Sequence, residues 1–123
     1  MKNCLRMILG VLFATLALCL TAATARAQDP AKVAPKNFKV LLENDQVRVL
    51  EFRAKPGEKI GMHSHPAYLT YMISGGGKTK FTSPDGKTTE QEAKVGQATW
   101  HQAETHAAES SGAVHVLLVE LKR

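Results

Sequence analysis

Residues 56–66 have the sequence PGEKIGMHSHP, and this stretch carries the strongest indication of both fold and chemistry. Pro56 and Gly57 are typical of a turn, and Pro66 ends the extended run that follows. Within that run, His63 and His65 are two residues apart. Successive side chains of a β-strand point to opposite faces, so these two imidazoles should lie on the same face, close enough to chelate a metal ion.

Two ligands hold a divalent metal weakly, so a third must come from a different strand. His106, in the segment 100–106, is the best candidate by position. The alternative is that His63 and His65 are ordinary polar side chains on a solvated strand and that His106 lies in a turn. We favour the metal site over this alternative.

The rest of the chain after residue 36 predicts an all-β domain. Short segments rich in apolar and β-branched residues alternate with turns, and Ser83-Pro84-Asp85-Gly86 is a strong hairpin signal. No ten-residue stretch has a clean helical period, so we expect eight or nine antiparallel strands in a barrel or sandwich, with little or no helix. The expected strands cover 38–43, 47–52, 60–65, 68–73, 78–82, 87–93, a segment ending at 101, a segment around 106–108, and 113–121.

Residues 1–27 have the pattern of a secretory signal peptide. Basic residues precede an apolar run over 7–20, and small residues end in Ala25-x-Ala27, so cleavage is predicted after Ala27. A lipoprotein signal using Cys19 is the alternative, and the bulky Leu18 before it argues against that. We therefore expect an exported protein, periplasmic or secreted, with a flexible lead over 28–36 and one domain over 37–123.

Removal of the signal changes the charge and the available metal ligands. The formal net charge falls from +5 to +2, because Lys2, Arg6 and Arg26 leave while all 11 acidic residues remain. This balance predicts no nucleic-acid partner. No membrane partner is expected once the signal peptide has been cleaved. Cys4 and Cys19 also lie in the signal, so the mature chain has no thiol and any metal must be held by nitrogen and oxygen.

The histidine pattern and its flanking glycines resemble the two motifs of the cupin superfamily, over about residues 47–121. The residues that fit the first motif are Gly57, His63, His65 and Gly75 or Gly76, and those that fit the second are Gly96, His106 and Ser110. The resemblance implies a double-stranded β-helix, or jelly-roll barrel, in which His63, His65 and His106 surround one metal in the barrel mouth. It also implies a homodimer.

The chain departs from these motifs in its ligands. The family's glutamate is absent, and its place falls on Tyr68, Leu69 or Thr70. Ser110 replaces the asparagine of the second motif, and His101 falls near the expected proline. A three-imidazole site without a carboxylate should leave a divalent ion with its full charge, which makes it a stronger Lewis acid that favours anionic ligands.

Several nearby residues have two interpretations each. Tyr68 and His101 are candidates for hydrogen-bond partners of the metal ligands or for substitute ligands, with packing as the alternative for both. Glu104 and Glu109 flank His106, and either would supply an oxygen ligand if its loop bends inward, with solvated charge as the default. Trp100 is expected to pack at a core or an edge. We expect His115 to be a packed histidine, although both faces of its strand are apolar enough to leave the register open.

The resulting hypothesis is an exported small cupin that binds one divalent metal, such as Fe, Zn, Mn, Ni or Cu, and a small molecule. Whether it turns that molecule over is open. Resemblance to three-histidine cupins suggests Fe(II)-dependent oxygen cleavage of a diketone- or thiol-like substrate, and next a metal-assisted isomerisation or hydrolysis. The alternative is a non-catalytic ligand-binding or structural cupin.

Overall fold

The computed structural model describes residues 28–123; the predicted signal peptide lies outside the described residues. Within them the chain forms one short helix and nine strands, and the predicted strands are confirmed with small shifts at their ends. The elements are α1 (Pro30–Val33), β1 (Phe38–Glu43), β2 (Val47–Ala54), β3 (Lys59–His65), β4 (Tyr68–Gly75), β5 (Lys78–Thr82), β6 (Thr88–Glu92), β7 (Ala98–His101), β8 (Glu104–Ser110) and β9 (Val114–Leu121).

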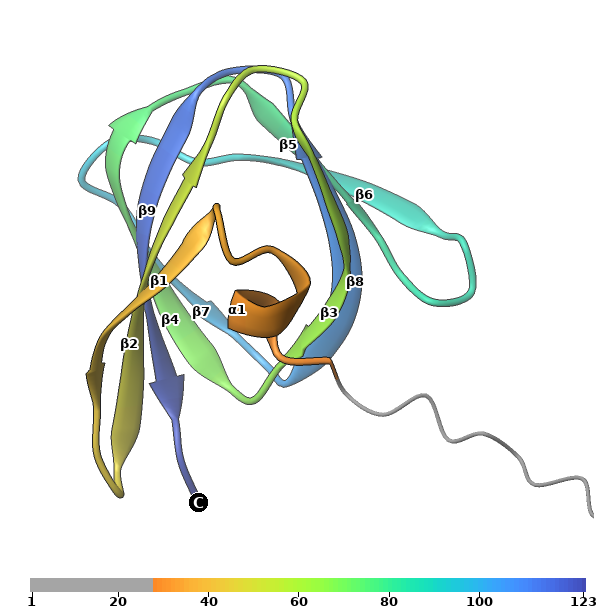
Figure 1. The fold of residues 1–123 in the computed structure, drawn as a ribbon. Helices are drawn as coiled ribbons and strands as arrows, with labels where there is room; N and C mark the ends of the chain where they lie inside the picture. The colour runs from red at the N-terminus through yellow and green to blue at the C-terminus, as the bar shows by residue number, and fades with distance from the viewer. Residues whose placement is uncertain (1–27) are drawn as a thin grey trace, which may run out of the picture.

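The strands form two antiparallel sheets that face each other around a shared interior (Figure 1). The five-stranded sheet has the order β1-β2-β9-β4-β7, and the four-stranded sheet has the order β3-β8-β5-β6. The Ser83–Gly86 turn joins β5 to β6 as predicted, with Gly86 at a φ of +85°. The architecture agrees with the expected all-β class.

Apolar side chains from both sheets fill one end of the interior. Leu50 is fully buried at the centre of a cluster that also contains Phe38, Ile60, Tyr68 and Leu118. Pairing of β9 with both β2 and β4 places this strand in the middle of its sheet. The core therefore forms directly beside the face of β3 that carries the two histidines.

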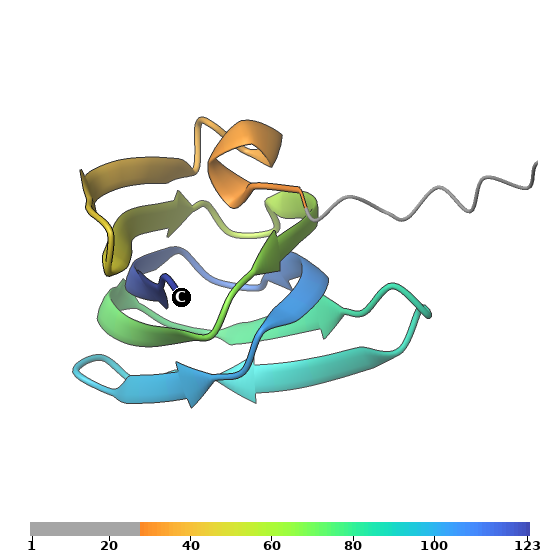
Figure 2. The same ribbon diagram turned by 90° about the horizontal axis from the view of Figure 1, so that it is seen from below.

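Residues 28–36 differ from the flexible lead that we expected. Residues 30–33 form one helical turn, α1, capped by the side chain of Asp29, which accepts a hydrogen bond from the Ala31 N–H at 2.9 Å. Pro30 is fully buried, and Ala31 packs against the core cluster. As Figure 2 shows, α1 lies beside β1 and β3 at one end of the molecule. The turn is too short for a helical period to be visible in the sequence.

The register of β9, which the sequence left open, is settled by burial. Val114, Leu118 and Glu120 face the interior, and His115 is on the opposite face. There His115 Nε2 lies 2.8 Å from the carboxylate of Glu51 on β2. His115 is therefore not a packed interior histidine but a half-buried partner of an outer carboxylate.

Part of the outer face of the five-stranded sheet is apolar. Tyr71, Ile73, Trp100 and Leu121 alternate with inward-facing residues and are each 39–50% exposed. Trp100 lies on β7, one of the two edge strands of this sheet, and is 50% exposed. Among residues 28–123, no helix is long and apolar enough to cross a membrane.

Candidate metal centre

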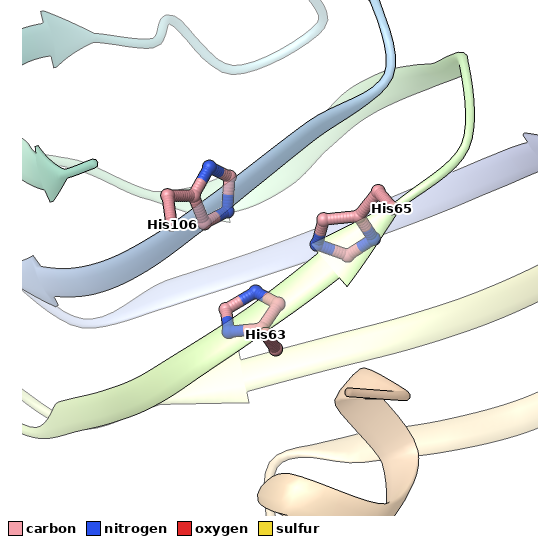
Figure 3. A group of neighbouring side chains, drawn as sticks. All are labelled: His63, His65 and His106. Atoms are coloured by element: carbon pink, nitrogen blue, oxygen red, sulfur yellow. The ribbon is translucent and has the colours of Figure 1, made fainter. Parts of the chain in front are cut away.

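The three predicted ligands, His63, His65 and His106, come together on the inner face of the four-stranded sheet. His63 and His65 project from β3, and His106 projects from the neighbouring strand β8, directly opposite His63 in the register (Figure 3). The centroid of the His63 ring lies 4.8 Å from the ring centroid of His65 and 4.8 Å from that of His106. We call these residues the three-histidine cluster.

The cluster has the burial and spacing of a metal site. All three histidines are buried, and one ring nitrogen from each lies within 4.8 Å of the others. Nitrogens bound to one ion at about 2.0–2.1 Å lie roughly 3 Å apart, so small rotations of the rings would complete the coordination. The spacing thus fits a single ion after a modest side-chain adjustment.

Hydrogen bonds on the outer side of the cluster leave one nitrogen free on each of two rings. His63 Nδ1 lies 2.7 Å from the carbonyl oxygen of Gly61, and His65 Nδ1 lies 2.7 Å from the carboxylate of Glu120. Both acceptors require a proton on Nδ1, which leaves the Nε2 lone pair available to a metal. This is the arrangement that metal-binding histidines usually have.

The surroundings of His106 are also compatible with metal binding. Its Nδ1 is buried and has no hydrogen-bond partner among the described residues, since the Glu104 carboxylate is 3.5 Å away. This nitrogen faces Glu104 on the outer side of the cluster, and the other ring nitrogen, Nε2, is left for an ion. The residues present therefore suit a divalent ion chemically, as three imidazoles with no sulfur donor.

Burial keeps His63 neutral. Desolvation, with smaller contributions from the two neighbouring imidazoles, lowers its pKa from 6.5 to about 4 against the opposing hydrogen bond to Gly61. A neutral imidazole is the form that binds metal. His63 is thus ready to bind across the physiological pH range.

Tyr68 and His101 lie next to the cluster but outside it. The Tyr68 ring stacks on His65 at 4.6 Å and on His101 at 4.5 Å, and its hydroxyl donates a 2.5 Å hydrogen bond to Glu104. Burial, then this hydrogen bond, raises the pKa of Tyr68, so the phenol stays protonated. Whether either residue acts on a bound metal remains a prediction.

The absent glutamate has no carboxylate substitute on β4. Of the three positions considered, Tyr68 and Thr70 line the interior cavity, while Leu69 lies between them and so faces outward. Thr70 Oγ1 instead lies 3.1 Å from His101 Nε2. The four-ligand arrangement of the family motif is therefore not present on this strand.

Two carboxylates nevertheless lie close to the outer nitrogens of the cluster. Glu120, which sequence reasoning missed, is 3% exposed beside His65, and Glu104, whose side chain is 40% exposed, lies 3.5 Å from His106. The long contact with His106, then the hydrogen bond from Tyr68, lowers the pKa of Glu104 to about 2 against partial burial. An ion in the cluster would have these two carboxylates nearby. They would offset part of its positive charge, which we expected from the sequence to remain uncompensated.

A cavity of about 120 Å³ adjoins the cluster and reaches across the interior between the two sheets. Its walls mix apolar side chains with a few polar ones. They include Phe38, Phe81, Met72, Val114, Gln91, Gln97, Thr79 and His101. A small molecule with one polar end would find both kinds of contact here.

Comparisons with known proteins agree with this fold. No protein-family model matches the sequence, and no curated protein matches it. Solved structures do. A cupin domain from Bordetella pertussis Tohama I superposes with a TM-score of 0.62 at 22% identity, over 70% of this chain and 92% of that one.

Two further structures extend the comparison. A cupin superfamily protein from Desulfitobacterium hafniense DCB-2 matches with a TM-score of 0.55 at 17% identity, over 70% of this chain and 76% of the other. Fe(II)-HppE with the alternative substrate (S)-1-HPP matches with a TM-score of 0.54 at 10% identity, over 68% of this chain and 48% of the other. The resemblance inferred from the sequence is confirmed at the level of architecture: the chain has the cupin fold.

Proposed function

We propose that this protein is an exported cupin that binds one divalent metal ion through His63, His65 and His106 and admits a small molecule to the adjoining cavity. The observation that carries the proposal is the buried three-histidine cluster, in which outer acceptors hold Nδ1 of His63 and His65. Three side chains arranged by chance on a solvated strand would be exposed and would have water as their partner.

The metal would act as a Lewis acid that polarises an oxygen of the bound molecule. The chain's own residues would do the rest. The apolar walls would exclude water, and Gln91 and Gln97 offer amide groups that could orient a polar substituent. Three protein ligands leave coordination positions for a substrate oxygen, which is typical of catalytic rather than purely structural metal sites.

We further propose that the bound molecule is turned over, with Fe(II) the first metal to test. The fold supports this choice because a structure with the same architecture is that of an Fe(II) protein with a substrate bound. The proposal is limited to a metal-assisted reaction of a small molecule. Oxygen-dependent cleavage is the reaction to test before isomerisation or hydrolysis.

Measurement of the metal content would distinguish the proposed metal site from the alternative in which the three histidines bind no ion. The exported chain would be purified, its first residue identified by mass spectrometry, and its metals measured before and after loading with Fe(II) or Zn²⁺. We expect one ion per chain in the wild type, and loss of binding in His63→Ala and His106→Ala. His115→Ala is the matched control, because His115 lies on the opposite face of its sheet and should leave binding unchanged.

Equal and substoichiometric metal in all four proteins would refute the site. One ion per chain without oxygen uptake or product formation, over a panel of small diketones and thiols, would instead support a ligand-binding cupin without turnover. A first residue other than Gln28 would correct the predicted cleavage site.

A further inference from the structure

Glu120 is an unusual residue in an otherwise apolar strand. It lies on β9 with its side chain in the interior, where it is 3% exposed, and its Oε1 is 2.7 Å from His65 Nδ1. A buried carboxylate is costly unless charged or polar partners surround it. Its position beside a predicted metal ligand therefore requires an explanation.

Arg48 supplies the second partner of Glu120 from the adjacent strand. The two residues are opposite each other in the β2–β9 register, and Arg48 NH1 lies 3.8 Å from Glu120 Oε2. The Arg48 side chain is itself only 14% exposed. A guanidinium at this depth also needs further compensation.

Asp29 provides that compensation from outside both sheets. Its Oδ1 accepts a 2.8 Å hydrogen bond from Arg48 NH2 and also caps α1 through the Ala31 N–H. Although partial burial alone would raise it, these two hydrogen bonds hold the pKa of Asp29 below its ordinary value. Asp29, Arg48, Glu120 and His65 thus form one continuous set of contacts, which we call the Glu120 network.

A second contact fixes the same segment to the cluster. The Ser64 N–H, between the two histidines of β3, donates a 2.8 Å hydrogen bond to the carbonyl oxygen of Gln28. The amino-terminal segment is therefore attached to β3 by its backbone and to His65 through the Glu120 network. Both attachments lie within the first two residues that follow the predicted cleavage site.

We propose that Asp29, Arg48 and Glu120 are positioning residues that hold His65 with its proton on Nδ1, so that the amino-terminal segment is part of the metal site. The inference rests on the metal site proposed above. Glu120 acts directly, by accepting the Nδ1 hydrogen bond that orients the ring. Arg48 and Asp29 act through it, by keeping the buried carboxylate compensated and in place. Partners of this kind usually change metal affinity 10–100-fold when they are replaced.

The test compares zinc affinity, measured by chelator competition, in the wild type and three variants. Glu120→Gln removes the charge but keeps the size, and we expect about a 10–100-fold weaker affinity. Asp29→Asn keeps a residue that can still cap α1, so its helix should persist, and we expect a smaller loss in the same direction. Glu109→Gln is the control, because Glu109 on β8 forms its 3.5 Å ion pair with Lys80 on β5, away from the network.

A spectroscopic measurement covers the case in which a variant fails to fold. In the metal-free wild type, long-range ¹⁵N–¹H NMR should show His65 with its proton on Nδ1. A proton on Nε2 would overturn the inference, as would equal zinc affinity in the wild type, Glu120→Gln and Asp29→Asn. A wild type that binds no zinc would overturn the proposed function itself, and this inference with it.

Discussion

The hydroxyl of Tyr68 can be removed without disturbing its ring, which makes Tyr68→Phe an informative substitution. Tyr68 is 3% exposed, and its ring stacks between His65 and His101. Phenylalanine keeps both stacking contacts and the buried apolar area. The single loss is the hydrogen bond from the Tyr68 hydroxyl to Glu104 Oε1 at 2.5 Å.

The expected cost follows from the exposure of the acceptor. A hydrogen bond to a charged group contributes about 1.5–3 kcal/mol to stability when the partner is left unsatisfied. The Glu104 side chain is 40% exposed, so water can replace the hydroxyl and the cost should fall to about 1 kcal/mol. For a domain of this size, 1 kcal/mol corresponds to a decrease of about 4–8 °C in Tm.

Urea unfolding of the metal-free protein would measure this difference, with Tyr71→Phe as the matched control. Tyr71 lies on the same strand but on the outer face, where it is 42% exposed, so loss of its hydroxyl should change the free energy of unfolding by less than about 0.5 kcal/mol. If both variants unfold at the same urea concentration, the Tyr68 hydroxyl does not stabilise the barrel mouth through Glu104. A loss well above 3 kcal/mol would show that it has a partner we have not identified.

Two other properties can be predicted. The pKa of His63 is about 4 in the folded protein and near 6.5 when the chain is unfolded, so the unfolded state binds more protons between these two pH values. The free energy of unfolding of the metal-free protein should therefore fall by on the order of 3 kcal/mol as the pH is lowered from 6.5 to 4. Urea titrations over this range would measure the fall, and a profile identical to that of His63→Ala would contradict it. If the predicted homodimer buries the apolar outer face, Trp100→Lys should convert a dimer to a monomer in sedimentation experiments, whereas Met62→Lys, on the other sheet, should not. A wild type that sediments as a monomer, or a Trp100→Lys variant that remains dimeric, would refute this interface.

The strands and the shared face of His63 and His65 were predictable because both depend on local patterns. Turn residues mark each strand end, and the i, i+2 spacing of His63 and His65 fixes their shared face once a strand is assumed. The partnership with His106 came from its place in the cupin-like motif. The structure adds that His106 is directly opposite His63 across a strand pair, which is why the rings meet.

The sequence could not predict features for which two arrangements fit the residue pattern equally well. Both faces of β9 are apolar, so alternation alone could not decide whether His115 or Glu120 points inward. The one available signal was that Glu120 is the only charged residue in a nine-residue apolar run, 113–121, which a metal or histidine partner would explain. Likewise, α1 is a single capped turn, and its order depends on the burial of Pro30 rather than on helical propensity.

The missing glutamate has a structural counterpart in the positions of Glu104 and Glu120. In the family motif, a carboxylate on the strand after the histidine pair would bind the ion directly and cancel part of its charge. Here the corresponding inward positions are Tyr68 and Thr70, and the carboxylates instead approach His106 and His65 from the outer side. Negative charge placed there increases the basicity of the imidazoles without occupying a coordination position. If the cluster binds an ion as proposed, the arrangement would leave more of its coordination sphere to a bound molecule than a four-ligand site would, while two nearby carboxylates would limit the net positive charge that this molecule meets.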